Sequence, residues 1–238
     1  FWFAVALTSF AVQIVSVSVG WQIYDITCDP LYLGLVGLAQ FLPALLLVLV
    51  TGLVADRVSR RLIWLVCLGI ELTAVTALLV YAIVHGHDIW PLYVVLVAVG
   101  IARAFVSPAT SSLAPNLVPP VALSNAVSLN ATAWQLASII GPVAGGLLYG
   151  VGANIAYGTA VVLLAAALFC VPRIKSPPQA MSSQAKSLDM LFAGFRYIFS
   201  EKVVLGAISL DLFAVLLGGA VALMPVFARD ILEVGPWG

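Results

Sequence analysis

Long apolar runs are the feature that most limits how this chain can fold. Seven of them approach or exceed the roughly 20 residues that an α-helix needs to cross a bilayer. Hydrophobic residues make up 63% of the chain and charged residues only 8%, whereas a soluble domain carries about 25% charged residues. A single water-soluble core cannot bury that much apolar surface. We therefore expect an all-α protein whose solvent is lipid.

Hydropathy and the positions of turn residues predict seven spans. Their expected bounds are 1–24, 34–53, 63–84, 91–113, 124–150, 153–171 and 203–224. The long hydrophilic stretch before the last span begins as a linker and ends with apolar residues at helical spacing, which predicts an amphipathic helix at the membrane surface. The chain thus divides into a six-helix unit (1–171), this linker (172–202), and a seventh span with an outer loop (203–238).

Basic residues predict the orientation of the spans. They cluster after the second and sixth spans, whereas the opposite side carries only Arg229. Because loops rich in Lys and Arg stay in the cytoplasm, the first span should start there and the seventh should leave it. The first span has no basic leader, so we do not interpret it as a signal peptide, and we expect the native start to lie upstream.

Composition and spacing also bear on the function classes. The formal net charge is zero, which gives no indication of a nucleic-acid partner. Three separated cysteines, Cys28, Cys67 and Cys170, form no disulfide or metal framework. The 85–88 stretch, with two histidines and an aspartate, is interpreted as a solvated turn rather than a metal site. We expect no cofactor, and no nucleophile–base pair stands at a spacing that suggests an enzyme.

Three ionisable residues, Glu71, Arg103 and Asp211, lie inside predicted spans. At 1.5 Å per residue, each lies roughly 13–15 Å from the cytoplasmic face, near the middle of the membrane. A charge in hydrocarbon costs at least about 2.5–3.5 kcal/mol, so each needs a reason to be there. Two interpretations stay open: proton coupling or substrate binding, and a static ion pair that fixes helix register.

Uncharged polar side chains recur at helical spacing on three spans. They are Ser9, Gln13 and Ser16 on span one, Ser107, Thr110 and Ser111 on span four, and Ser128, Thr132 and Gln135 on span five. Such groups suit a polar or amphipathic organic substrate better than a bare ion. Four aromatic residues at the outer interface are Trp21, Tyr24, Trp90 and Tyr93. Membrane anchoring is the favoured role for these rings, with substrate stacking as the alternative.

The segment after the second span carries the most specific motif. It reads Gly52-Leu53-Val54-Ala55-Asp56-Arg57-Val58-Ser59-Arg60-Arg61, which places charge on a tight turn between two spans. This run resembles the signature loop of the major facilitator superfamily, with Ser59 in place of the second glycine. In span five, Gly141-Pro142-Val143-Ala144-Gly145-Gly146 resembles the Gly-Pro-x-x-Gly-Gly element of the proton-coupled exporters of that superfamily. Ordinary close packing of helices is the alternative role of these glycines.

The signature loop also has a physical interpretation of its own. Gly52 lets another helix approach its backbone, and Asp56 can meet the positive N-terminal end of span three. Arg57, Arg60 and Arg61 hold the loop in the cytoplasm. The resemblance implies in addition that the loop latches the two halves of the transporter together in the outward-open state, with a plain topology anchor as the alternative.

Further segments are similar to the branch of the superfamily that contains the enterobactin exporter. They are residues 21–25, 33–38 and 224–230. The resemblance implies a transporter of the bacterial inner membrane with six helices in each half, of which this chain lacks most of the carboxy-terminal half. Such a protein exports a small organic molecule, of siderophore or drug type, by alternating access coupled to protons.

The resemblance also assigns positions to the charges within the membrane. The first, fourth and seventh helices of the superfamily line a central cavity, which places Arg103 and Asp211 there. Asp211 would then carry the proton, and Arg103 would modulate it or bind an anionic substrate group. Span three lies outside that cavity, so neutralising a neighbour is the favoured role for Glu71. An uptake permease and a non-transporting membrane scaffold remain the alternatives for the whole protein.

Overall fold

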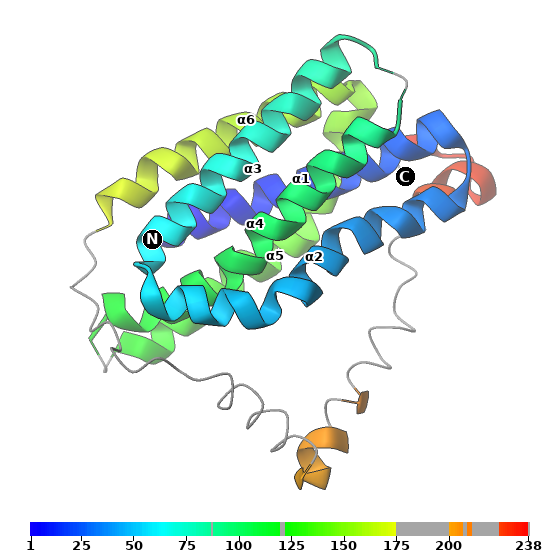
Figure 1. Cartoon of the computed structure of the whole chain (residues 1–238). Helices are drawn as coiled ribbons and strands as arrows, with labels where there is room; N and C mark the ends of the chain where they lie inside the picture. Colours follow the sequence, from blue (N-terminus) through cyan, green and yellow to red (C-terminus); the bar gives the residue numbers. More distant parts are fainter. Residues whose placement is uncertain (87, 120–121, 175–199, 207–208, 211–223, 238) are drawn as a thin grey trace.

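Six long helices form a bundle in the computed structural model (Figure 1), which describes residues 1–86, 88–119, 122–174, 200–206, 209–210 and 224–237. The helices are α1 (Trp2–Thr27), α2 (Pro30–Arg57), α3 (Arg60–Ile83), α4 (Trp90–Leu117), α5 (Leu123–Val151) and α6 (Ala153–Cys170). All six are long and apolar enough to cross a membrane, which confirms the predicted all-α membrane fold.

Short elements complete the described chain. A single 3₁₀ turn, η2 (Val171–Arg173), follows α6, and the carboxy-terminal segment contains α9 (Met224–Val226), the π-helical turn η4 (Phe227–Ile231) and η5 (Gly235–Trp237). The predicted amphipathic helix of the linker and most of the seventh span, including Asp211, lie outside the described residues.

The turn between α1 and α2 is encoded by three consecutive residues. Cys28 adopts a left-handed conformation, with φ at 51°, and its N–H donates to the carbonyl of Tyr24 to close α1. Asp29 then caps α2 by accepting a 2.9 Å hydrogen bond from the N–H of Leu31. Pro30 fills the first position of α2, where no N–H is needed. Two helices of membrane length therefore reverse direction within two residues.

The turn between α2 and α3 is shorter than predicted, because α2 continues to Arg57. No Gly or Pro interrupts the helical pattern after Gly52, so Val58 and Ser59 alone connect the helices. Most of the signature motif is therefore the last two turns of a helix rather than a loop. The side chains of Asp56 and Arg57 lie outside the described part, and the role of this motif as a latch stays a prediction.

Two arginines of the motif bind carbonyl groups near the ends of other helices. Arg60 Nη1 donates to the carbonyl of Ser112 in α4 at 2.7 Å, and Arg61 Nη2 donates to the carbonyl of Pro172, just after α6. These contacts join the start of α3 to the last third of α4 and to the turn after α6. Both contacts lie within the six-helix bundle. We call this the inner end and the end with the α1–α2 turn the outer end, after the sidedness that the sequence predicts.

Helix α1 lies at the centre of the packing. It contacts α5 and α6 extensively, whereas α2 packs on α4, and α3 packs on α4 and α6. Glycines of α5 allow the closest approach: a Cβ at Gly141 would lie 2.5 Å from the Cβ of Gln13, and one at Gly145 would lie 3.2 Å from the Cα of Ile14. Small residues thus bring α1 and α5 together by backbone packing, the main source of helix association in lipid.

Cys28 provides a natural test of the predicted sidedness. It is exposed at the outer end, whereas Cys67 is buried. In intact cells, a membrane-impermeant maleimide is expected to label the wild-type protein through Cys28. A Cys28→Ser, Ser59→Cys variant should be labelled only after the cells are permeabilised. Labelling of the Ser59→Cys variant in intact cells would reverse the orientation.

Candidate functional site

A cavity of about 1200 Å³ opens between α1, α2, α4 and α5. We call it the large cavity; residues of the 224–237 segment line it together with the four helices. Most of its wall is apolar, and the polar or charged side chains are Gln13, Ser16, Trp21, Gln40, Thr51, Arg103 and Ser107. Typical ligand pockets have volumes of about 300–1,000 Å³ with few polar groups, so the large cavity can hold a sizeable organic molecule.

The predicted site residues divide into those that line this cavity and those that do not. Gln13, Arg103 and Ser107 line it, and from the α5 glycine element so do Pro142 and Gly146.

Gln135 does not line the cavity. It is exposed on the same face of α5 as Pro142, but it lies two helical turns nearer the inner end. Helical spacing predicts the face of α5 on which Gln135 lies. It does not predict how far the cavity extends along α5, and the cavity does not reach Gln135.

Arg103 is held against α2 by a hydrogen bond and a close backbone contact. Its Nη1 donates to Oε1 of Gln40 at 3.2 Å. One turn earlier in α4, a Cβ at Gly100 would lie only 2.7 Å from the carbonyl oxygen of Gln40, so the glycine lets α2 come close enough to present this partner. Sequence reasoning missed Gln40, although it is the only side chain between Tyr32 and Thr51 that can hydrogen-bond.

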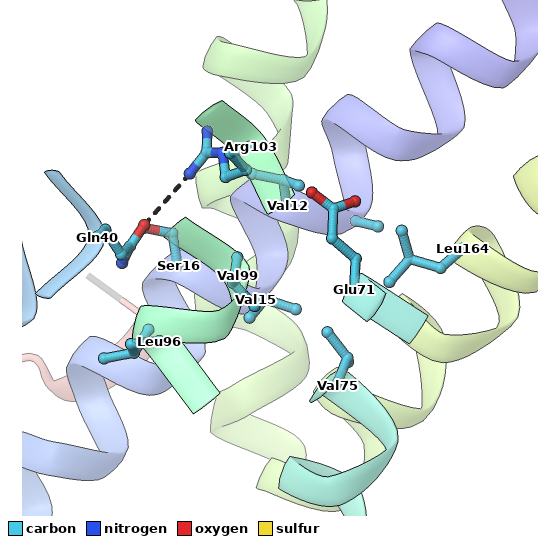
Figure 2. Close-up of a pocket in the computed structure, with 11 residues that line it drawn as sticks. Val12, Val15, Ser16, Gln40, Glu71, Val75, Leu96, Val99, Arg103 and Leu164 are labelled. Carbon is cyan, nitrogen blue, oxygen red and sulfur yellow. Dashed lines mark hydrogen bonds between the residues drawn. The ribbon is translucent and has the colours of Figure 1, made fainter. Parts of the chain in front are cut away.

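Glu71 lies behind the wall of the large cavity. It is only 1% exposed and lines a second, small cavity of about 10 Å³, whose wall is formed by α1, α3, α4 and α6 with Gln40 of α2 (Figure 2). Neither carboxylate oxygen has a hydrogen-bond partner among the described residues. Its electrostatic partner is Arg103, whose guanidinium turns toward Gln40 instead of forming a direct ion pair (Figure 2).

Three residues line both cavities. Ser16, Gln40 and Arg103 belong to the wall of the large cavity and to the wall of the small one. The sequence predicted a shared depth for Glu71 and Arg103. In the structure both residues line the small cavity, and Arg103 also lines the large one. Asp211, the third predicted charge, lies outside the described residues.

A polar network connects the carboxy-terminal segment to the outer end of the bundle. Asp25, near the end of α1, accepts hydrogen bonds from Arg229 Nη1 at 2.9 Å and from the hydroxyl of Tyr149 in α5 at 2.8 Å. Tyr24 donates a hydrogen bond to Asp230, and the guanidinium of Arg229 lies 5.5 Å from the centre of the Tyr24 ring. We call these five residues the outer network. The sequence shows charged residues at the ends of spans but does not predict which of them pair.

Backbone contact reinforces the outer network. A Cβ at Gly146 of α5 would lie 2.8 Å from the carbonyl oxygen of Pro236 in η5. In Figure 1 the carboxy-terminal segment, drawn in red, lies at the end of the bundle where α1 ends and α2 begins. The segment therefore covers the outer end of the large cavity.

The outer network also corrects the prediction for two aromatic residues. Trp21 and Tyr24 are 6% and 2% exposed, so they do not anchor the protein at the membrane interface. Trp21 stacks on Tyr149, with 6.5 Å between ring centres, and lines the large cavity. Trp90 remains 75% exposed, as anchoring requires. Tyr24 is in contact with Asp230 and Arg229 of the carboxy-terminal segment, whereas Trp21 packs on Tyr149 of α5.

The family model of the Major Facilitator Superfamily matches residues 1–237. This chain belongs to the major facilitator superfamily. It is therefore a multi-pass protein of the bacterial cell membrane and a member of a family of transporters, as the signature motif predicted.

Individual relatives are distant. The chain is 24% identical over 205 residues to the uncharacterized transporter y4rN of Sinorhizobium fredii, covering 84% of this chain and 50% of the relative. It is 25% identical over 247 residues to macrolide efflux protein A of Streptococcus pyogenes (99% and 59%). It is 29% identical over 164 residues to the enterobactin exporter EntS of Shigella boydii (66% and 38%). The chain spans about half the length of the curated relatives it matches.

Gly100→Ala is expected to destabilise the protein by displacing Gln40. The added methyl group meets backbone rather than a flexible side chain, so overpacking should cost about 1–3 kcal/mol. Gly37→Ala on α2 is the matched control, because a Cβ there meets nothing within 4 Å. Melting temperatures of the full-length proteins in detergent measure the difference. Equal melting temperatures for the two variants would contradict the close contact between α2 and α4.

Proposed function

We propose that the chain forms the first half, and the start of the second half, of an exporter that exchanges a small organic molecule for protons. The observation that carries the proposal is the large cavity. Among the described residues of its wall, Arg103 is the charged side chain, and the others are apolar or uncharged polar. A membrane scaffold has no need of such a cavity. Two relatives named for the efflux of a macrolide and the export of enterobactin support export over uptake.

The substrate class is of siderophore or drug type. Residues 21–25, 33–38 and 224–230 resemble the branch that contains the enterobactin exporter. The first and last of these segments contain four of the five residues of the outer network. The polar groups Gln13, Ser16 and Ser107 would orient an amphipathic molecule without binding a bare ion.

Alternating access gives each segment of the chain a role. The six-helix unit (1–171) would rock against a second bundle that begins with span 203–224, and the linker 172–202 would join them on the cytoplasmic side. The outer network then represents the closed outer gate of a state in which the large cavity is reached from inside. Opening outward requires the bond between Asp25 and Arg229 to break.

Proton coupling is tested with Asp211→Asn in the full-length protein. If Asp211 carries a proton, the variant should reach the membrane normally but lose accumulation of substrate driven by a pH gradient in proteoliposomes, while exchange without a gradient persists. Asp88→Asn, at an exposed turn of the outer end, is the control. If Asp211→Asn remains fully coupled, Asp211 has no part in the mechanism. If a pH gradient does not drive substrate movement in the wild type, proton-coupled export is contradicted.

Arg229→Gln is expected to open the outer end. The exposed pair with Asp25 contributes only about 0.2–1 kcal/mol, so the variant should still fold. Its equilibrium should shift toward the state in which the outer end is open. A Val36→Cys probe in a Cys28→Ser background lines the large cavity and should react several-fold faster with an impermeant maleimide from outside when Arg229 is replaced. Glu233→Gln, an exposed residue of the same segment, is the control. Unchanged reactivity would show that this pair does not gate the cavity.

A further inference from the structure

Glu71 combines features that a purely structural residue does not need. It is almost fully buried, both carboxylate oxygens lack hydrogen-bond partners among the described residues, and it lines a small cavity. A cavity of about 10 Å³ is near the minimum for one water molecule. A carboxylate kept only to neutralise Arg103 would be expected to contact it directly, because leaving a buried charge without hydrogen bonds is costly. The geometry instead leaves space for about one water molecule beside the carboxylate.

The groups that face Glu71 give it one charged neighbour in the described chain. From α4 it faces Arg103 and apolar residues. The rest of the wall of the small cavity consists of Ser16 and apolar residues from α1, Gln40 from α2 and Leu164 from α6. On its own helix, the Cys67 thiol lies one turn earlier and is buried. Protonation of Glu71 therefore mainly removes the negative charge that compensates Arg103.

Within the proposed proton-coupled export, we infer that Glu71 is a proton site and that the ligand which competes with this proton in the large cavity is an amphipathic organic cation. With Glu71 ionised, the charge of Arg103 is compensated from behind the wall, and the large cavity accepts a positive ligand. When Glu71 takes up a proton from the external solution, the charge of Arg103 is left uncompensated in the cavity wall and repels the cation. The proton later leaves Glu71 toward the cytoplasm.

The sign of this coupling decides the charge of the ligand. An anion on Arg103 would weaken the attraction between Arg103 and Glu71 and so favour protonation, and by reciprocity proton and anion would bind together. Export driven by inward proton flow needs proton and substrate to bind alternately. Coupling through Arg103 therefore selects a cation, in contrast to the anionic group that the sequence suggested for this residue.

Two probes of equal shape and opposite charge test the inference on the full-length protein in lipid nanodiscs. Tetraphenylphosphonium should bind more tightly as pH rises, by about 5–150-fold in total, the usual range for coupling between two sites, and should release protons into a weakly buffered solution. Tetraphenylborate should not release protons. Because Gln resembles protonated Glu, Glu71→Gln should bind the cation weakly at every pH without proton release, and Glu71→Asp should restore the release. Glu201→Gln, an exposed carboxylate outside the bundle, should behave as the wild type.

Each contrary result has a definite meaning. No binding of the cation, proton release that persists in Glu71→Gln, or a pH dependence that favours the anion would each overturn the inference. The proteoliposome assay on the same variants separates it from the proposed function: if Glu71→Gln retains substrate accumulation driven by a pH gradient, the role of Glu71 fails while proton-coupled export stands.

Discussion

A charge within the membrane must be compensated inside the protein, and the arrangement at the centre of this bundle follows from that requirement. Arg103 lies within the membrane, so its charge needs partners inside the protein. It donates a hydrogen bond to the side chain of Gln40 on one side and receives electrostatic compensation from Glu71 on the other. Both neighbours depend on close helix packing. Gly100 admits α2 at the level of Gln40, and α3 carries Glu71 against α4.

The same close packing shapes the large cavity. Gly141 and Gly145 bring α1 against α5, while Pro142 and Gly146 on neighbouring faces of that helix line the cavity or receive the carboxy-terminal segment. A single glycine-rich helix thus both packs against α1 and lines the large cavity. For this reason the two interpretations of the α5 motif, helix packing and an exporter element, are compatible.

Much of the fold can be predicted from the sequence because it depends on the length of apolar segments in lipid and on the helical spacing of residues. Apolar length predicted the six helices, Asp29 and Pro30 encode the start of α2, and helical depth placed Glu71 and Arg103 in one layer. Contacts between distant segments were not accessible in this way. The bond between Tyr149 and Asp25 joins residues 124 positions apart, and no periodicity reports such a pairing. Gln135 shows the same limit, since its face was predictable and the extent of the cavity was not.

The proposed coupling makes two events exclude each other: protonation of Glu71, outside the large cavity, and binding of a cation inside that cavity. Infrared difference spectroscopy of the full-length protein, with and without tetraphenylphosphonium, measures this most directly. Ligand binding is predicted to remove the carbonyl band of a protonated carboxylic acid, and this change should be absent from Glu71→Gln. A difference band of the same size in Glu71→Gln, or no protonated carboxyl in the wild type at acidic pH, would contradict the account.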